Sequence, residues 1–166
     1  MSELKSDIQA LSHRLHSSKL EYLGLEAAAS GFCRELSDRQ NVKIDFRCDG
    51  LPEDLSYDIS LCLFRVLQEA LHNAVKYSGV DQFEVSLECV SQIIQLRVHD
   101  SGARFDPKLP TASVGLGLTS MKERLKLVSG ELSIHSKPHE GTTILARIAI
   151  GQRTTTDQRT TAHTVA

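Results

Sequence analysis

Residues 57–79 read YDISLCLFRVLQEALHNAVKYSG, and their apolar spacing sets the fold of the surrounding chain. Apolar side chains recur on one half of a helical wheel: Ile59, Leu63, Val66, Leu67, Ala70, Leu71, Ala74 and Val75. This spacing predicts a long amphipathic helix over 57–77 that ends before Ser78-Gly79, a suitable C-terminal cap. Such a helix must bury its apolar half against other elements.

The polar half of this helix carries Glu69, Asn73 and Lys76 at spacings of four and three residues. These three side chains fall within roughly 60° of one another on one helical stripe. They can be the water-facing side of the helix. They can also form a metal–nucleotide site, because an amide oxygen suits Mg²⁺, a lysine reaches phosphate and a carboxylate accepts a proton. The spacing alone leaves both interpretations open.

The flanking sequence predicts an α+β fold. The expected helices are 3–16, 20–38 (after a break at Ser17-Ser18) and 117–128, and the expected strands are 42–47, 83–90, 93–100, 131–136 and 142–150. The short polar turn at Ser91-Gln92 indicates a hairpin. This order implies a two-layer α/β sandwich, in which a mixed, mostly antiparallel sheet is covered by helices on one face.

The composition is that of a soluble globular domain. The 166 residues are 40% hydrophobic and 24% charged, with a net charge of −2, which gives no support for nucleic-acid binding. No apolar run reaches the length of a membrane helix, and the N-terminus lacks a signal peptide, so we expect a cytoplasmic location. The four cysteines are scattered, which favours reduced thiols over disulfides or a metal site.

Two glycine-containing segments follow the long helix. In HDSGARFD (99–106), Asp100 ends a strand and Gly102 leaves space for a flat ligand, although an ordinary turn explains the same residues. In SVGLGLTSMKERL (113–125), Gly115 and Gly117 precede a helix and can hold a polyphosphate, although a flexible loop explains them equally well. The second segment is neither a dinucleotide fingerprint nor a P-loop.

Taken in order, these segments resemble the catalytic ATP-binding domain of bacterial sensor histidine kinases. LFRVLQEALHNAVKYSG looks like the asparagine box of that family, HDSGARFD like its first glycine box and GLGLTSMKERL like its second. EGTTILARI, with Gly141, resembles the closing strand. The likeness covers about residues 20–149 and extends to the superfamily shared with gyrase and the mismatch-repair ATPases, whose fold is the Bergerat-type sandwich.

The resemblance implies ATP and Mg²⁺ as cofactors. Asn73 would ligate Mg²⁺, Glu69 would be the catalytic residue that orients or deprotonates the attacking group, and Lys76 would contact phosphate. Asp100 would bind the adenine amine. The other nucleotide-binding positions implied are Gly102, Gly115, Gly117, Thr142 and Thr143.

The chain departs from the family pattern in the first glycine box. Ser101 replaces the usual asparagine, and Arg104 stands where a second glycine belongs. A side chain at that position can strain the turn or crowd the nucleotide, so we expect ATP binding to be weakened but not abolished. The alternative is that Arg104 adds a cation near the phosphates.

The N-terminal segment 1–19 resembles the end of the dimerisation hairpin in the nitrate-sensor subclass. That subclass phosphorylates a histidine followed by an acidic residue, whereas His13 is followed by Arg14 and His16 by Ser17. We therefore expect the acceptor histidine to lie outside this segment, in a longer parent kinase. We expect that parent to be a homodimer, and the sequence is compatible with a membrane anchor elsewhere in it. Alone, the chain should bind nucleotide without labelling itself efficiently. The implied partners are the phosphoacceptor hairpin and the receiver domain of a response regulator.

Residues 20–150 would form the catalytic domain, and 151–166, poor in apolar residues, a disordered tail. Two rival functions stay open at this stage. One is another enzyme on the same fold, a serine kinase of the anti-sigma type or an ATPase. The other is a degenerate interaction module without activity, which Arg104 would favour.

Overall fold

The computed structural model describes the backbone of residues 2–102, 112–137 and 140–151, and the side chains of 18–102, 115–137 and 140–151. One helix takes the place of the first two predicted ones, and the later elements follow the predicted order: α1 (Ser2–Gln40), β1 (Lys43–Asp49), α2 (Tyr57–Tyr77), β2 (Gln82–Val90), β3 (Ile93–Asp100), α3 (Ala112–Leu127), β4 (Gly130–Lys137) and β5 (Gly141–Ala149). The predicted α+β class is confirmed.

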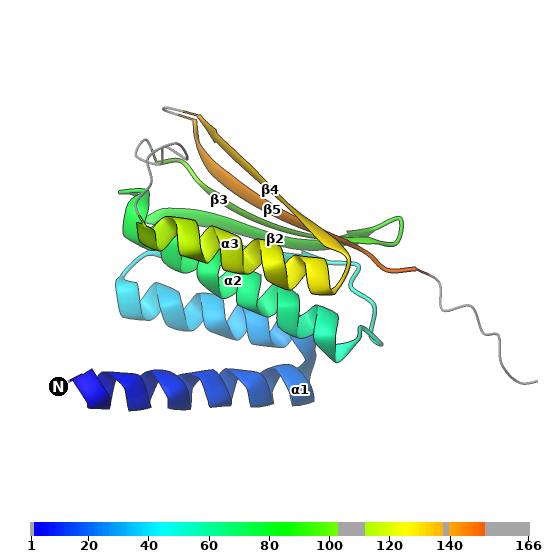
Figure 1. Cartoon of the computed structure of the whole chain (residues 1–166), viewed down its shortest axis with the longest axis horizontal. Helices are drawn as coiled ribbons and strands as arrows, with labels where there is room; N and C mark the ends of the chain where they lie inside the picture. Colours follow the sequence, from blue (N-terminus) through cyan, green and yellow to red (C-terminus); the bar gives the residue numbers. More distant parts are fainter. Residues whose placement is uncertain (1, 103–111, 138–139, 152–166) are drawn as a thin grey trace, which may run out of the picture.

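The five strands form one mixed sheet in the order β1-β2-β3-β5-β4. β1 pairs with β2 in parallel, because α2 crosses over between them, and the other three pairings are antiparallel. The hairpin at Ser91-Gln92 is confirmed, since both residues have positive φ, as the tightest hairpin turns require. All helices lie on one side of the sheet (Figure 1), as predicted.

α2 lies between α1 and α3 and forms the centre of the helical layer (Figure 1). Its N-cap Ser56 accepts a hydrogen bond from the backbone N–H of Ile59, and it ends at the predicted cap, where Gly79 has φ of 75°. Its apolar half is buried against the sheet and α1. A T-shaped contact between Phe32 and Phe64, with ring centroids 5.9 Å apart, joins α1 to α2.

The predicted helix break at Ser17-Ser18 is wrong. α1 continues through these serines and bends at Gly24, where φ is 80° and ψ is 176°. Serine is tolerated inside a helix, whereas this backbone conformation is almost confined to glycine. Leu20 and Leu25, on either side of the bend, are both buried in the core.

Several other predictions concern residues at the edges of the described ranges. α3 begins at Ala112, not at about 117 as expected. Arg104, the side chains of His13 and His16, and the tail beyond Gly151 lie outside the described residues. None of the described helices combines the length and apolarity that a membrane span requires.

The cysteines are free thiols, as predicted. Burial raises the pKa of Cys33 to about 12 and that of Cys62 to about 11. These two thiols are therefore protonated at neutral pH and act as small apolar side chains of the core.

Candidate functional site

A pocket opens where the C-terminal half of α2 meets β3, β5 and α3. Its empty volume is about 390 Å³, part of which is open to solvent. The lining residues are Ala70, Asn73, Ala74, Tyr77, Ser78, Val98, Asp100, Leu118, Thr142 and Ile144. The predicted site residues Asn73 and Asp100, which are 27 residues apart in sequence, thus line one cavity.

Asp100 contributes a buried carboxyl group to the lining of this pocket. Its side chain is only 5% exposed, and its Oδ1 accepts a hydrogen bond of 2.9 Å from the backbone N–H of Gly102. Burial raises the pKa of Asp100, while the backbone N–H groups of Gly102 and Thr142 and the nearby His99 partly oppose this shift. A buried carboxylate of this kind is a strong acceptor for a ligand N–H group.

Two glycines allow the backbone to close around Asp100. A Cβ on Gly102 would overlap the backbone carbonyl of Ser78, at the end of α2. A Cβ on Gly141 would overlap the carbonyl of Asp100, and Gly141 also has φ of 84°. Neither position accommodates a side chain, so the glycines bring α2 and β5 against the end of β3.

Glu69 and Asn73 interact with each other on the polar half of α2. The Asn73 Nδ2 donates to Glu69 Oε1 over 3.3 Å, and both side chains are half-buried. α3 packs directly over these two side chains. A Cβ on Gly117 would overlap Glu69 Oε1 and lie 3.2 Å from Asn73 Nδ2. The polar stripe is therefore not simply a water-facing surface.

The glycines of the second glycine box are placed differently from the sequence prediction. Gly115 and Gly117 lie inside α3 and not in a loop before it. Gly117 is buried against α2, whereas Gly115 is exposed and would have nothing within 4 Å of an added Cβ. The structure thus brings Gly117, but not Gly115, to the Glu69–Asn73 pair.

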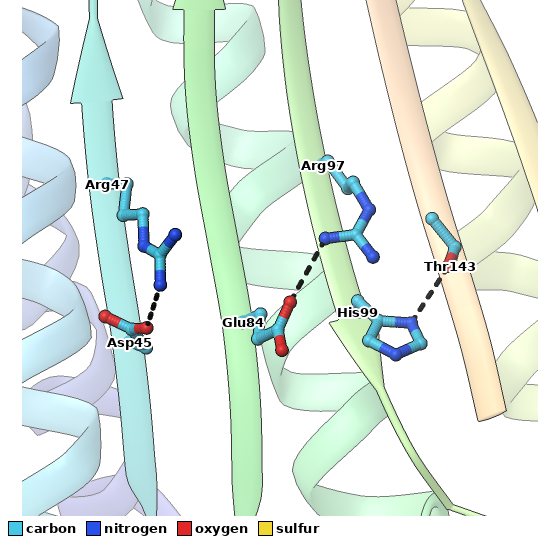
Figure 2. A network of polar contacts seen from close by, with 6 residues as sticks. All are labelled: Asp45, Arg47, Glu84, Arg97, His99 and Thr143. Carbon is cyan, nitrogen blue, oxygen red and sulfur yellow. Dashed lines mark hydrogen bonds and ion pairs between the residues drawn. The ribbon is translucent and has the colours of Figure 1, made fainter. Parts of the chain in front are cut away.

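The remaining predicted residues divide between the two faces of the sheet. Thr142 is 5% exposed and lines the pocket, with its hydroxyl 3.2 Å from Ser136 Oγ. Thr143 points to the opposite, helix-free face, where its hydroxyl lies 2.9 Å from His99 Nδ1 in a row of polar side chains (Figure 2). Lys76 is exposed, with its Nζ 4.9 Å from the centroid of the Tyr77 ring. Neither Lys76 nor Thr143 lines the pocket.

Sequence reasoning missed the apolar lining of the pocket. Val98, Leu118 and Ile144 occupy ordinary core positions of their elements, so their spacing carries no separate signal. Ala70 and Ala74 offer a weak one, because two small residues one turn apart leave room on a helix face next to Asn73.

The residues present suit a magnesium ion with few protein ligands. Among the described residues, no three His, Cys, Asp or Glu side chains form a cluster able to hold a metal ion. Mg²⁺ usually keeps several waters and binds one or two protein oxygens together with phosphates, so a single amide such as Asn73 is compatible with it.

Comparisons with known proteins point to one family. The model of the family described as histidine kinase-, DNA gyrase B-, and HSP90-like ATPase matches residues 59–152. The chain is 35% identical over 154 residues to the oxygen sensor histidine kinase NreB of Staphylococcus carnosus; the match covers 90% of this chain but only 43% of NreB.

Solved structures share the fold. The histidine kinase domain of the Erythrobacter litoralis EL346 blue-light activated histidine kinase superposes with a TM-score of 0.64 at 18% identity, covering 78% of this chain and 62% of that one. Full-length ShkA in complex with AMPPNP gives a TM-score of 0.63 at 16% identity, covering 90% and 39%. The family model spans more than half of the sequence and includes Asn73, Asp100 and Gly117, so the chain belongs to the histidine kinase-, DNA gyrase B-, and HSP90-like ATPase family.

Proposed function

We propose that this chain is the catalytic ATP-binding part of a two-component sensor histidine kinase. It binds ATP with Mg²⁺ and transfers the γ-phosphoryl group to a histidine on a separate helical hairpin of the parent protein. The observation that carries this proposal is the pocket in which Asn73 of α2 and the buried carboxyl of Asp100 lie together. The match to the ATPase family and the likeness to NreB support it.

The pocket suits an adenine ring. Val98, Leu118 and Ile144 supply apolar surface, and Asp100 supplies one oriented acceptor for the exocyclic amine. Because Oδ1 of Asp100 already accepts from Gly102, the carboxylate is held in place before the base arrives. Thr142 adds a hydroxyl at the same end of the pocket.

The triphosphate would run from the pocket past Asn73 toward Glu69. The Asn73 amide nitrogen donates to Glu69, and this leaves the amide oxygen for the metal ion. When bound, Mg²⁺ supplies neutralisation of the phosphate charge. Lys76 is one turn from Asn73 and exposed, so its long side chain can swing to a phosphate oxygen. Gly117 of α3 lies directly against the Glu69–Asn73 pair and would border a phosphate bound there.

Glu69 is the general base that acts on the acceptor histidine. It accepts the N–H proton of the attacking imidazole, whose other ring nitrogen forms the new P–N bond. The bond from the γ-phosphorus to the β–γ bridging oxygen breaks, and ADP leaves. This chain contributes positioning and charge neutralisation, since the γ-phosphoryl group passes directly from ATP to the acceptor histidine without a covalent bond to a residue of this chain.

The parent protein would be a homodimer in which the hairpin of the acceptor histidine pairs two copies. The phosphoryl group would then pass to an aspartate of a response regulator receiver domain.

The test is labelling with γ-³²P-ATP and Mg²⁺, in the full-length parent kinase and in the isolated chain. We expect acid-labile label on the parent and none on the isolated chain. Glu69→Gln should lower labelling about 10²-fold or more while nucleotide still binds. Asp81→Asn, an exposed carboxylate outside the pocket, is the control. Acid-stable label would indicate a serine kinase, and absence of both label and nucleotide binding would indicate an inactive module.

A further inference from the structure

The two strands that bring Asp100 and Thr142 to the pocket are joined by a second pair of side chains on the other face of the sheet. His99 of β3 lies in register with Thr143 of β5, next to the pair formed by Asp100 and Thr142. Successive side chains of a strand point to opposite faces of the sheet. The His99–Thr143 pair therefore lies on the helix-free face, directly behind the pocket (Figure 2).

His99 and Thr143 form a hydrogen bond across the two strands. The Nδ1 atom of His99 lies 2.9 Å from the hydroxyl oxygen of Thr143, and both side chains are half-buried. A hydroxyl donates to an unprotonated ring nitrogen and accepts from a protonated one, so the contact is available to either form of the ring. Another side-chain bond between β3 and β5, from Arg147 to Gln95, is exposed and lies further from the pocket.

The bond lies close to the point where the pairing of β3 and β5 stops. β3 ends at Asp100 and β5 begins at Gly141. His99 and Thr143 form the next-to-last pair of the two strands, and the last pair is the one that lines the pocket. The ends of paired strands open more easily than their centres. A side-chain bond at this place therefore limits how far the two strand ends separate.

The carboxylate of Asp100 is held from both strands. Burial raises its pKa, and the backbone N–H groups of Gly102 and Thr142, together with the charge of His99, partly oppose this shift. The N–H of Gly102 donates over 2.9 Å, whereas the N–H of Thr142 comes from β5. A small separation of the strand ends would weaken the second bond and allow the carboxylate to turn. The orientation of Asp100 therefore depends on how closely β5 is held against β3.

The other charged groups on this face leave the His99–Thr143 bond undisturbed. Glu84 of β2 lies in register with His99, but its carboxylate accepts a hydrogen bond of 3.3 Å from Arg97 (Figure 2). His135 of β4 lies on the other side of Thr143 and is exposed. The nearest carboxylate on this face is thus bound by an arginine, and the imidazole interacts with the threonine.

We propose that His99 and Thr143 are positioning residues of the adenine site: their hydrogen bond behind the sheet holds β5 against β3 and so fixes the carboxylate of Asp100 for the exocyclic amine of the base. This inference rests on the proposed function and deepens it, because it assigns part of the base specificity to the face of the sheet opposite the nucleotide. It gives Thr143 an indirect role in place of the nucleotide contact that the family resemblance implies.

The test compares two nucleotides in each variant. ADP carries the amine that Asp100 binds in the proposed function, whereas purine riboside diphosphate carries a hydrogen in its place. Calorimetry with Mg²⁺ measures both dissociation constants. We expect the unmodified chain to bind ADP about tenfold more tightly, since a hydrogen bond to a charged group contributes on this order. Thr143→Val and His99→Leu should lower the ratio to about threefold or less, because a carboxylate that turns makes a poorer bond.

Two conservative variants should keep the ratio of the unmodified chain. Thr143→Ser retains the hydroxyl, and His99→Asn retains a polar atom near the position of Nδ1. The controls Ser86→Ala and His135→Leu remove a hydroxyl and an imidazole from the same face outside the bond, and should also keep the ratio. A variant that is merely less stable loses affinity for both nucleotides alike, so the ratio separates positioning from stability.

The inference would be overturned if Thr143→Val and His99→Leu kept the ratio, or if Thr143→Ser and His99→Asn lost it as well. Equal affinity of the unmodified chain for the two nucleotides would remove the amine contact of Asp100 and this role with it. Failure of the proposed function is distinguishable from these results, because the unmodified chain would then bind neither nucleotide, and the inference would fall with it.

Discussion

At the scale of single residues, the carboxyl group of Asp100 is the most specialised group of the site. It is buried at the end of β3 and held by the backbone N–H of Gly102, and burial raises its pKa above the ordinary value of 3.8. The neighbouring glycines are needed because Gly102 and Gly141 pass too close to other backbone atoms for any side chain. An orienting contact and a desolvated charge at one position are typical of a group that meets a ligand.

The raised pKa gives a prediction about pH. Below pH 3.8 the neutral carboxyl group contributes its full share of stability, and this share is lost as the pH rises through the raised folded-state pKa. Asp100→Asn removes this loss. As the pH rises from mildly acidic to neutral, the free energy of unfolding of the parent should therefore fall relative to that of the variant. Urea unfolding at a series of pH values measures it.

In the proposed function the ionised carboxylate binds the adenine amine, so nucleotide binding should have the opposite dependence on pH. Affinity for Mg²⁺-ADP should fall as the pH drops through the raised pKa of Asp100, and in Asp100→Asn it should be weaker by about tenfold or more at neutral pH and show a flatter pH profile. Isothermal titration calorimetry at a series of pH values measures the affinities of the parent and of the variant. Asp81→Asn is the matched control, and a parental pH profile in Asp100→Asn would remove Asp100 from the site.

At the scale of elements, α3 and α1 each depend on a glycine in a way that their helical pattern does not show. α3 passes so close to α2 that Gly117 touches the Glu69–Asn73 pair, and α1 turns through an otherwise forbidden conformation at Gly24. Each helix also contains a second glycine, Gly115 or Gly31, with open space around it. These pairs separate the effect of helix propensity from that of the local contact.

In α3, alanine should have opposite effects at two positions that are two residues apart. Gly117→Ala forces Glu69 or α3 to move and should destabilise the fold by about 1–3 kcal/mol. Gly115→Ala relieves the entropic cost of glycine in a helix and should stabilise it by about 0.5–1 kcal/mol. Urea unfolding of both variants measures the difference, and equal effects would mean that α3 does not pack closely on α2 at Gly117.

In α1, Gly24→Ala should destabilise the fold by about 1–3 kcal/mol, because alanine is strained at φ of 80° and ψ of 176°. Straightening the helix would relieve the strain but would disturb the burial of Leu20 and Leu25. Gly31→Ala, in the regular part of α1, should be neutral or stabilising. Chemical unfolding compares the two variants, and a stable Gly24→Ala protein would show that the bend is not needed.

At the scale of the whole molecule, the sheet separates two surfaces with different roles. Its inner face carries the core and the pocket under the helices. Its outer face carries exposed polar pairs, among them Arg47 with Asp45 and Arg97 with Glu84 (Figure 2). Exposed pairs of this kind contribute little to stability, so the fold depends on the inner face. The pocket is built there from α2, β3, β5 and α3.

Because the pocket joins elements from both layers, its ligand should stabilise the whole domain. Mg²⁺-ATP at 100 times its dissociation constant adds about 2.7 kcal/mol, which corresponds to roughly 5–10 °C in the melting temperature. Thermal unfolding with and without nucleotide measures the shift. Asn73→Ala should reduce the shift and Asp81→Asn should preserve it. The absence of any shift at millimolar nucleotide would contradict the proposed function.

The sequence alone determined the order of the elements after α1 and the long helix with its cap, because these depend on local spacing along the chain. The resemblance to the kinase family placed Asn73, Glu69 and Asp100 in ordered motifs. Only the tertiary structure decided that α1 bends at Gly24, that Gly117 lies within α3 against Glu69, and that Thr142 faces the pocket while Thr143 faces away. These features depend on which distant elements pack together, and no local periodicity records that choice.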